Sequence, residues 1–200
     1  MRSAVGSALQ WQPINKHWGN KLDPRLQALL DKQEITDLVY AYCNASDRHD
    51  HEKLRALYHP DATDDHGAFF KGLASEFIDK LPEIQAPMEI LHHNITNLNI
   101  AVDGDYAEGE IYVLAFHRIS TDEEPMDLLI GGRYFDRYEK REGVWKFSAK
   151  AVVADWATIN SPSTVQLDHP LLAGSYIGKP GPEDPSYPFF KLFKWGEHQA

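Results

Sequence analysis

Apolar side chains recur at helical spacing in the first part of the chain. Asp23-Pro24 supplies a helix cap and a proline suited to the first helical turn. Leu26, Leu29 and Leu30 come first, and apolar positions then follow at i, i+3, i+4 and i+7, namely Ile35, Leu38, Val39 and Tyr42. This spacing places them on one face, so the sequence predicts an amphipathic helix from residue 23 to about residue 47.

Shorter elements are predicted next. Asp50 can cap a second helix that stops at His59-Pro60, because the residue before a proline disfavours the α conformation. A turn and a short strand are expected at 62–70. A third helix is predicted over 72–81, where Pro82 is expected to end it.

From residue 88 the apolar period changes to two. Four extended segments are predicted, at 88–102, 106–120, 126–139 and 144–158, and short turns separate them. We therefore predict an antiparallel meander. Helices followed by a long curved antiparallel sheet indicate an α+β fold, in which the sheet wraps around the N-terminal helices as a cone-shaped barrel and encloses a pocket.

The two ends of the chain differ from this pattern. Residues 1–22 lack any periodicity and are interpreted as an N-terminal arm on the fold or on a neighbouring subunit. Residues 23–158 form the predicted cone domain. Residues 159–200 are rich in proline, glycine and aromatic side chains, so we expect a C-terminal extension that docks near the pocket or on a neighbouring subunit.

Composition excludes several classes of partner. Lys plus Arg total 20 against 30 for Asp plus Glu, and a net charge of -10 disfavours nucleic acid and anionic membranes. The single Cys43 cannot form an internal disulfide. Because the N-terminus also lacks a signal-like apolar stretch and no segment is long enough to span a membrane, we predict a cytoplasmic protein.

Three residues point to proton-transfer chemistry. Asp47 stands where the first helix ends and His93 lies near the start of a strand, so both can meet inside the pocket. A carboxylate bound to one imidazole nitrogen leaves the other free to remove a substrate proton. Tyr42 could polarise a carbonyl or assist a departing oxygen. The structural alternatives are a carboxylate bound to local backbone, a core histidine and a core tyrosine.

Histidines and carboxylates also gather between the first helix and the third. The group comprises Asp47, His49, Asp50, His51, His59, Asp61, Asp64, Asp65 and His66. Their spacing matches neither a zinc-protease helix nor a calcium loop, so no metal is predicted. Gly131-Gly132 precedes no helix and is interpreted as relief of crowding in a bent strand, so no nucleotide cofactor is predicted either.

Four segments, at 42–50, 57–62, 93–97 and 132–147, resemble the SnoaL-like branch of the nuclear transport factor 2-like superfamily. This branch includes scytalone dehydratases, bile-acid 7α-dehydratases and hexachlorocyclohexane dehydrochlorinases. The resemblance covers about 23–158.

The resemblance implies a cofactor-independent lyase that often forms a homotrimer. It implies His93 as general base, Asp47 as its orienting carboxylate and Tyr42 as a hydrogen-bonding phenol. Lys150, His117 and Asn97 are implied as substrate-binding residues, although Lys150 would stand where the dehydrochlorinases have an arginine.

The predicted function is a dehydratase-type elimination, with or without loss of formaldehyde, on a bulky apolar substrate of lignin or phenylpropanoid type. A homotrimer or homodimer is expected. The alternatives are proton shuttling as in ketosteroid isomerase, a noncatalytic module that binds small molecules, and a dioxygenase small subunit.

Overall fold

The computed structural model describes residues 23–198, so the predicted arm at 1–22 lies outside the described residues. Helix α1 (Pro24–Asp47) forms as predicted. The Asp23 side chain caps it by accepting a hydrogen bond from Arg25 N at 2.8 Å. Ile35, Leu38, Val39 and Tyr42 face the core, whereas Leu26, Leu29 and Leu30 expose 44–63% of their surface.

The C-terminal end of α1 has the hydrogen bonds of a Schellman motif. His49 takes a left-handed conformation with φ of 57°. The His49 amide donates to Ser46 O at 3.1 Å, and the Asp50 amide donates to Ala45 O at 2.8 Å. The motif fixes Asp47 as the last helical residue, with the chain turning sharply away after it.

Two predictions based on proline are wrong. Helix α2 (His51–Ala56) ends before Tyr58, where strand β1 (Tyr58–Asp65) begins and carries Pro60. Proline is tolerated because the ladder between β1 and its neighbour is irregular between Tyr58 and Thr63.

Helix α3 (Ala74–Gln85) also runs through Pro82. Its last turn is anchored by Gln85, whose amide donates to Ser46 O at 3.3 Å and whose oxygen lies 2.7 Å from His51 Nε2.

Four long strands pair antiparallel in sequence order, as predicted. They are β3 (Met88–Asp103), β4 (Tyr106–Ile119), β5 (Met126–Arg141) and β6 (Val144–Asn160). Strand β2 (Lys71–Leu73) pairs antiparallel with β1, but β1 pairs parallel with β6. The six-stranded order is β2-β1-β6-β5-β4-β3, so the sheet is mixed rather than wholly antiparallel.

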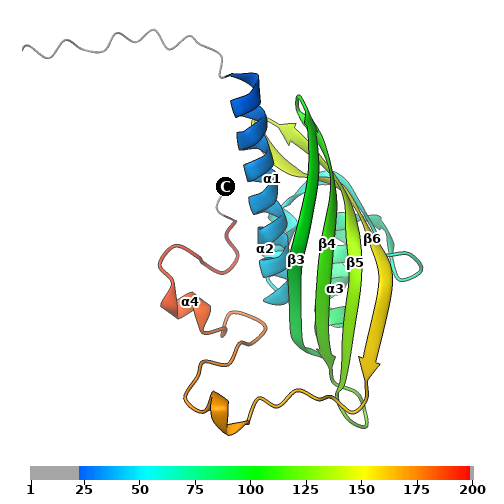
Figure 1. The fold of residues 1–200 in the computed structure, drawn as a ribbon, viewed down its shortest axis with the longest axis vertical. Helices are drawn as coiled ribbons and strands as arrows, with labels where there is room; N and C mark the ends of the chain where they lie inside the picture. Colours follow the sequence, from blue (N-terminus) through cyan, green and yellow to red (C-terminus); the bar gives the residue numbers. More distant parts are fainter. Residues whose placement is uncertain (1–22, 199–200) are drawn as a thin grey trace, which may run out of the picture.

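Helix α1 runs along the long strands on the inner face of the sheet, and α3 lies on that side as well (Figure 1). The core forms between this face and the helices, where Ile111, Tyr138 and Phe147 are fully buried. This arrangement confirms the predicted α+β cone.

Irregular positions bend the sheet. The pairing of β5 with β6 shifts in register at Gly131-Gly132. A Cβ atom at Gly131 would overlap the Trp156 ring, and a Cβ atom at Gly132 would overlap Val153 O. Only glycine leaves room for this close approach, so the predicted relief of crowding is confirmed.

The segment after β6 returns to the outer side of the helices (Figure 1). Arg48 Nη1 contacts Asp184 Oδ2 at 2.7 Å, and the amides of Gly181 and Gly196 donate to Arg48 O at 2.7 Å and Asp50 Oδ2 at 2.6 Å. Docking on a neighbouring subunit stays a prediction. Across residues 23–198, no helix is long and apolar enough to cross a membrane.

Candidate functional site

Asp47 and His93 meet at the junction of α1 and β3. His93 Nδ1 lies 2.6 Å from Asp47 Oδ1, and the His93 amide donates to both carboxylate oxygens at 3.1 Å. Each side chain is only 9% exposed. Because the carboxylate accepts from both the ring and the backbone of His93, it fixes the ring orientation and leaves Nε2 available to a ligand.

His93 lines a cavity of about 200 Å³ between the sheet and the helices. Most of the wall is apolar, with Phe77 and Leu81 contributed by α3 and Val113 and Ala115 by β4. A small apolar cavity with few polar groups is the usual form of a small-molecule site. No described residue of the C-terminal segment lines it.

Tyr42 also lines this cavity, five residues before Asp47 on α1. Its ring packs edge-on against Tyr134 at 5.8 Å and Phe147 at 5.7 Å. Burial, together with the charge of Asp64, raises the pKa of Tyr42 well above its usual range. The phenol therefore stays protonated and can donate a hydrogen bond.

His117 faces the same cavity from β4. Its ring centroid lies 6.1 Å from that of His93, with the two planes at 80°. Burial and the nearby charge of His93 lower the pKa of His117, which favours a neutral ring. Its buried Nδ1 has no hydrogen-bond partner within the described part of the chain. A polar group on a bound ligand could supply that partner.

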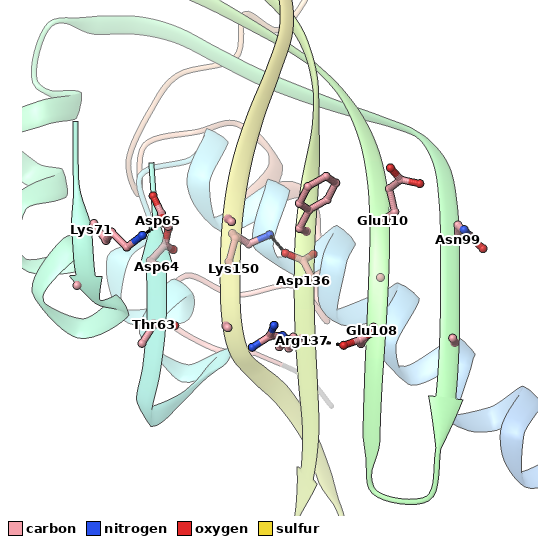
Figure 2. A pocket seen from close by; sticks show the side chains of 16 residues that line it. Thr63, Asp64, Asp65, Lys71, Asn99, Glu108, Glu110, Asp136, Arg137 and Lys150 are labelled. Atoms are coloured by element: carbon pink, nitrogen blue, oxygen red, sulfur yellow. Dashed lines mark hydrogen bonds and ion pairs between the residues drawn. The ribbon is translucent and has the colours of Figure 1, made fainter. Parts of the chain in front are cut away.

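Lys150 is not among the residues that line this cavity. Its Nζ lies 2.8 Å from Asp136 Oδ1, and the two side chains point toward each other from β6 and β5 (Figure 2). The ammonium also sits 4.0 Å from the ring centroid of Tyr134 and 4.3 Å from that of Tyr42. Lys150 therefore supports the cavity wall from behind these two rings.

Asn97 does not face the cavity either. The register of β3 shifts between Ile95 and Leu98, and Asn97 is exposed at that irregularity. The side chains that point inward are Leu91, His93 and Ile95 before the shift and Leu98, Ile100 and Val102 after it. The extra residue therefore turns Asn97 outward, whereas strict alternation from His93 would turn it inward.

A third imidazole lines the cavity, and its role was not predicted. His66 follows β1, its ring stacks on Phe77 at 4.3 Å, and its Nδ1 lies 2.8 Å from Asp64 Oδ1. Tyr58 Oη donates to the other Asp64 oxygen at 3.0 Å. In the sequence, Asp64 and His66 stand out only as members of a group of histidines and carboxylates whose spacing predicts no metal site. Among residues 23–198, no group of three or more His, Cys, Asp or Glu residues could hold a metal ion.

A larger hollow of about 940 Å³ lies on the outer face of the sheet and spans strands from β2 to β3 (Figure 2). It does not include His93. Its charged side chains are largely paired, as in Lys71 with Asp65 at 2.7 Å and Arg137 with Glu108 at 4.0 Å. The polar side chains of the inner cavity are less exposed to solvent and less completely paired with other side chains. The inner cavity is therefore the better candidate site.

Comparisons with known proteins agree with this fold. The chain matches the SnoaL-like domain family over residues 27–151. No curated protein sequence matches it.

Among solved structures, a type 2 hexachlorocyclohexane dehydrochlorinase (LinA) is 25% identical with a TM-score of 0.65, covering 71% of this chain and 97% of its own. A candidate scytalone dehydratase from Novosphingobium aromaticivorans is 24% identical with a TM-score of 0.62, covering 71% and 93%. A type 3 LinA from Novosphingobium barchaimii is 23% identical with a TM-score of 0.64, covering 71% and 98%.

The family match includes α1 with Asp47, the strand that carries His93, and most of the sheet. It extends over more than half of the sequence. The chain therefore belongs to the SnoaL-like family of the nuclear transport factor 2-like superfamily.

Proposed function

We propose that this protein is a cofactor-independent lyase that removes a proton and a leaving group from an apolar, ring-bearing small molecule. The observation that carries the proposal is the 2.6 Å contact between His93 Nδ1 and Asp47 Oδ1 at the wall of a largely apolar cavity. Among similar structures, the names dehydratase and dehydrochlorinase both describe eliminations, which supports lyase-type chemistry.

In the proposed reaction, His93 Nε2 takes a proton from a substrate carbon. The Asp47 carboxylate stabilises the imidazolium that forms, because it already accepts a hydrogen bond from Nδ1. A positioned base of this kind contributes roughly 10²–10⁴-fold to the rate. The leaving group departs as the electrons of the C–H bond form a double bond.

Tyr42 and His117 would stabilise the charge that develops on the substrate. The Tyr42 phenol stays protonated, and a neutral His117 can donate from one ring nitrogen. Both line the cavity with His93. We therefore propose that they bind a carbonyl oxygen next to the acidic carbon, where negative charge accumulates during proton removal.

Cavity size limits the substrate. The volume of about 200 Å³ lies below the roughly 300–1,000 Å³ of cavities that hold drug-sized ligands. We propose a substrate with a single ring, such as a phenylpropanoid unit, rather than a two-ring lignin dimer. The aromatic side chains in the wall, including Tyr42, Phe77 and Tyr134, offer surfaces for stacking on that ring.

The test uses two probe ketones, 3-hydroxy-1-phenylpropan-1-one and 3-chloro-1-phenylpropan-1-one. Both give phenyl vinyl ketone, which is followed by its ultraviolet absorbance after subtraction of the uncatalysed rate, with EDTA present. We expect turnover of both by the wild-type protein and loss of roughly 10²–10⁴-fold in His93→Ala. His92→Ala is the matched control, since His92 is exposed on the opposite face of β3.

Three other outcomes would argue against the proposed elimination. Equal turnover by His93→Ala and wild type would contradict the proposal. A product with unchanged mass would indicate proton shuttling, and tight binding of the ketones without turnover would indicate a binding module.

We also propose that the protein self-associates through the outer face of the sheet. Tyr112, Leu114, Phe135 and Trp156 expose 37–49% of their surface there. Exposed apolar residues on neighbouring strands are typical of an interface between subunits. Analytical ultracentrifugation should show a dimer or trimer, and Phe135→Glu should shift it toward monomer.

A further inference from the structure

We propose that His66 is a further catalytic residue, the general acid that protonates the leaving oxygen when a hydroxyl group is eliminated. This inference rests on the proposed lyase function and adds to it. It assigns chemistry to a side chain that the Asp47–His93 pair does not use.

His66 and His93 approach the cavity from opposite edges of the sheet. His66 directly follows β1, next to the edge strand β2, whereas His93 lies in β3, the other edge strand. Curvature of the sheet around the helices brings both imidazoles to the wall of one cavity of about 200 Å³. A ring-bearing ligand that fills so small a cavity contacts both walls.

His66 also lies beside a buried carboxylate, but the two groups are close without forming the hydrogen bond that joins His93 Nδ1 to Asp47. His66 Nδ1 lies 2.8 Å from a carboxylate oxygen of Asp64, whose side chain is only 1% exposed. Tyr58 Oη donates to the second Asp64 oxygen at 3.0 Å, which orients the carboxylate. Stacking on Phe77 fixes the plane of the His66 ring. With Nδ1 next to Asp64, Nε2 is the nitrogen left for a ligand.

The carboxylate makes His66 the better proton donor of the two remaining cavity histidines. The negative charge of Asp64, 2.8 Å away, can compensate the positive charge of a protonated His66. Among the described residues His117 has no carboxylate within ion-pair distance, and burial and the charge of His93 lower its pKa, which favours the neutral ring. His117 is suited to hydrogen bonding, and His66 is suited to proton donation.

The resulting step is balanced. His93 Nε2 takes a proton from the substrate carbon, and the electron pair of that C–H bond becomes the new double bond. The C–O bond breaks with its electrons on oxygen, and the proton on His66 Nε2 joins that oxygen to form water. His93 then returns a proton to solvent and His66 takes one up, which resets the site without an external reductant or oxidant.

Leaving-group chemistry tests this role. Hydroxide departs poorly unless it is protonated, whereas chloride departs without a proton. We therefore expect His66→Gln to lower turnover of 3-hydroxy-1-phenylpropan-1-one by roughly 10²–10⁴-fold and turnover of the chloro ketone by less than about tenfold. Because both substrates are measured on one preparation, the ratio of the two rates does not depend on how much of the variant folds.

Two further variants test whether Asp64 supports the proposed role of His66. Asp64→Asn should change the ratio in the same direction, because it removes the carboxylate that supports the His66 imidazolium. Asp65→Asn is the matched control and should leave the ratio unchanged, since Asp65 contacts Lys71 on the outer face.

An unchanged ratio in His66→Gln, or turnover of only the chloro ketone by wild type, would overturn the role of His66 while leaving His93 as the base. Wild-type turnover that His93→Ala retains, or no turnover of either ketone, would instead overturn the proposed function together with this inference.

Discussion

Lys150 and Asp136 form an ion pair of 2.8 Å in which neither side chain has any exposure to solvent. Tyr138 Oη donates to the other Asp136 oxygen at 2.8 Å, so both oxygens of the carboxylate have partners. Burial raises the pKa of Asp136 even though Lys150 opposes that shift. The pair therefore places two charged groups beneath the cavity. Removing them from water costs free energy, and only complete pairing of both groups offsets that cost.

Replacing one member of this pair should destabilise the fold. Lys150→Met leaves the Asp136 carboxylate without its cation, and we expect the free energy of unfolding to fall by about 3–5 kcal/mol. Urea denaturation followed by tryptophan fluorescence measures the change. The double variant Lys150→Met/Asp136→Asn should recover part of the loss, because no buried charge remains. A single variant as stable as wild type would show that Asp136 is neutral or hydrated.

Asp47→Asn should lower turnover with little effect on folding. An Asn side chain has the same shape, but it presents an amide group to a site where the His93 ring and backbone both donate. The ring loses its fixed orientation and the support for its charge, so we expect turnover of the probe ketones to fall by roughly 10²–10⁴-fold. Circular dichroism checks the fold, and unchanged turnover would argue against an orienting role for Asp47.

Tyr42→Phe should separate hydroxyl chemistry from packing. The phenyl ring keeps the edge-on contacts to Tyr134 and Phe147, so stability should change by less than about 1 kcal/mol. Loss of a donor to developing negative charge should lower turnover by roughly 10²–10³-fold. Tyr40→Phe serves as the control, because Tyr40 is on the same helix and is 50% exposed. Equal turnover in the two variants would exclude Tyr42 as that donor.

Stability should fall as the pH drops from 7 toward 4. Burial, with the nearby charges of His51 and Arg48, lowers the pKa of His49 to about 4. In the unfolded chain a histidine takes up a proton near its usual pKa of about 6.5. Between these values the unfolded state binds more protons, so unfolding becomes easier as the pH falls.

Chemical denaturation at pH 7, 6 and 5 measures this slope. His49→Asn should flatten it, since asparagine does not titrate and tolerates the left-handed conformation at this position. The exposed His92→Gln should leave the slope as in wild type. A slope that His49→Asn leaves unchanged would assign the pH dependence to other groups.

Asp184 should control docking of the C-terminal segment. Burial opposes its ionisation, but hydrogen bonds from Ser186, Lys179 N and Arg48 lower the pKa of Asp184 to about 2. Its contribution is therefore complete above the unfolded pKa near 3.8 and is lost as the pH falls toward 2. Asp184→Asn should increase hydrogen exchange and protease cleavage in residues 161–198. Glu183→Gln, at an exposed neighbour, should not.

Strong periodic signals were sufficient to predict the main elements. Helix α1 and the four long strands follow from apolar spacing, because one face of each must be buried. The proline signals failed because tertiary contacts outweighed them. Gln85 anchors α3 beyond Pro82. Pro60 has no amide hydrogen to donate, and the irregular ladder of β1 does not require a hydrogen bond from it.

Sequence analysis brought together Asp47 and His93 because each stands at a recognisable end of an element. The sequence did not place His66 in the same cavity as His93, since that placement depends on curvature of the whole sheet rather than on local spacing. Nor could alternation show that Lys150 is paired with Asp136, because that pairing depends on the register of β5 and β6.

The shift in β3 between Ile95 and Leu98 also affects how homologous chains should be aligned. A relative whose strand lacks the extra residue would present the opposite set of side chains to its interior over the distal half of the hairpin. Counting a fixed number of positions from the histidine then equates a solvent-facing residue of one protein with a buried residue of the other. Transfer of residue roles within the family beyond this point therefore requires a one-residue gap in the alignment.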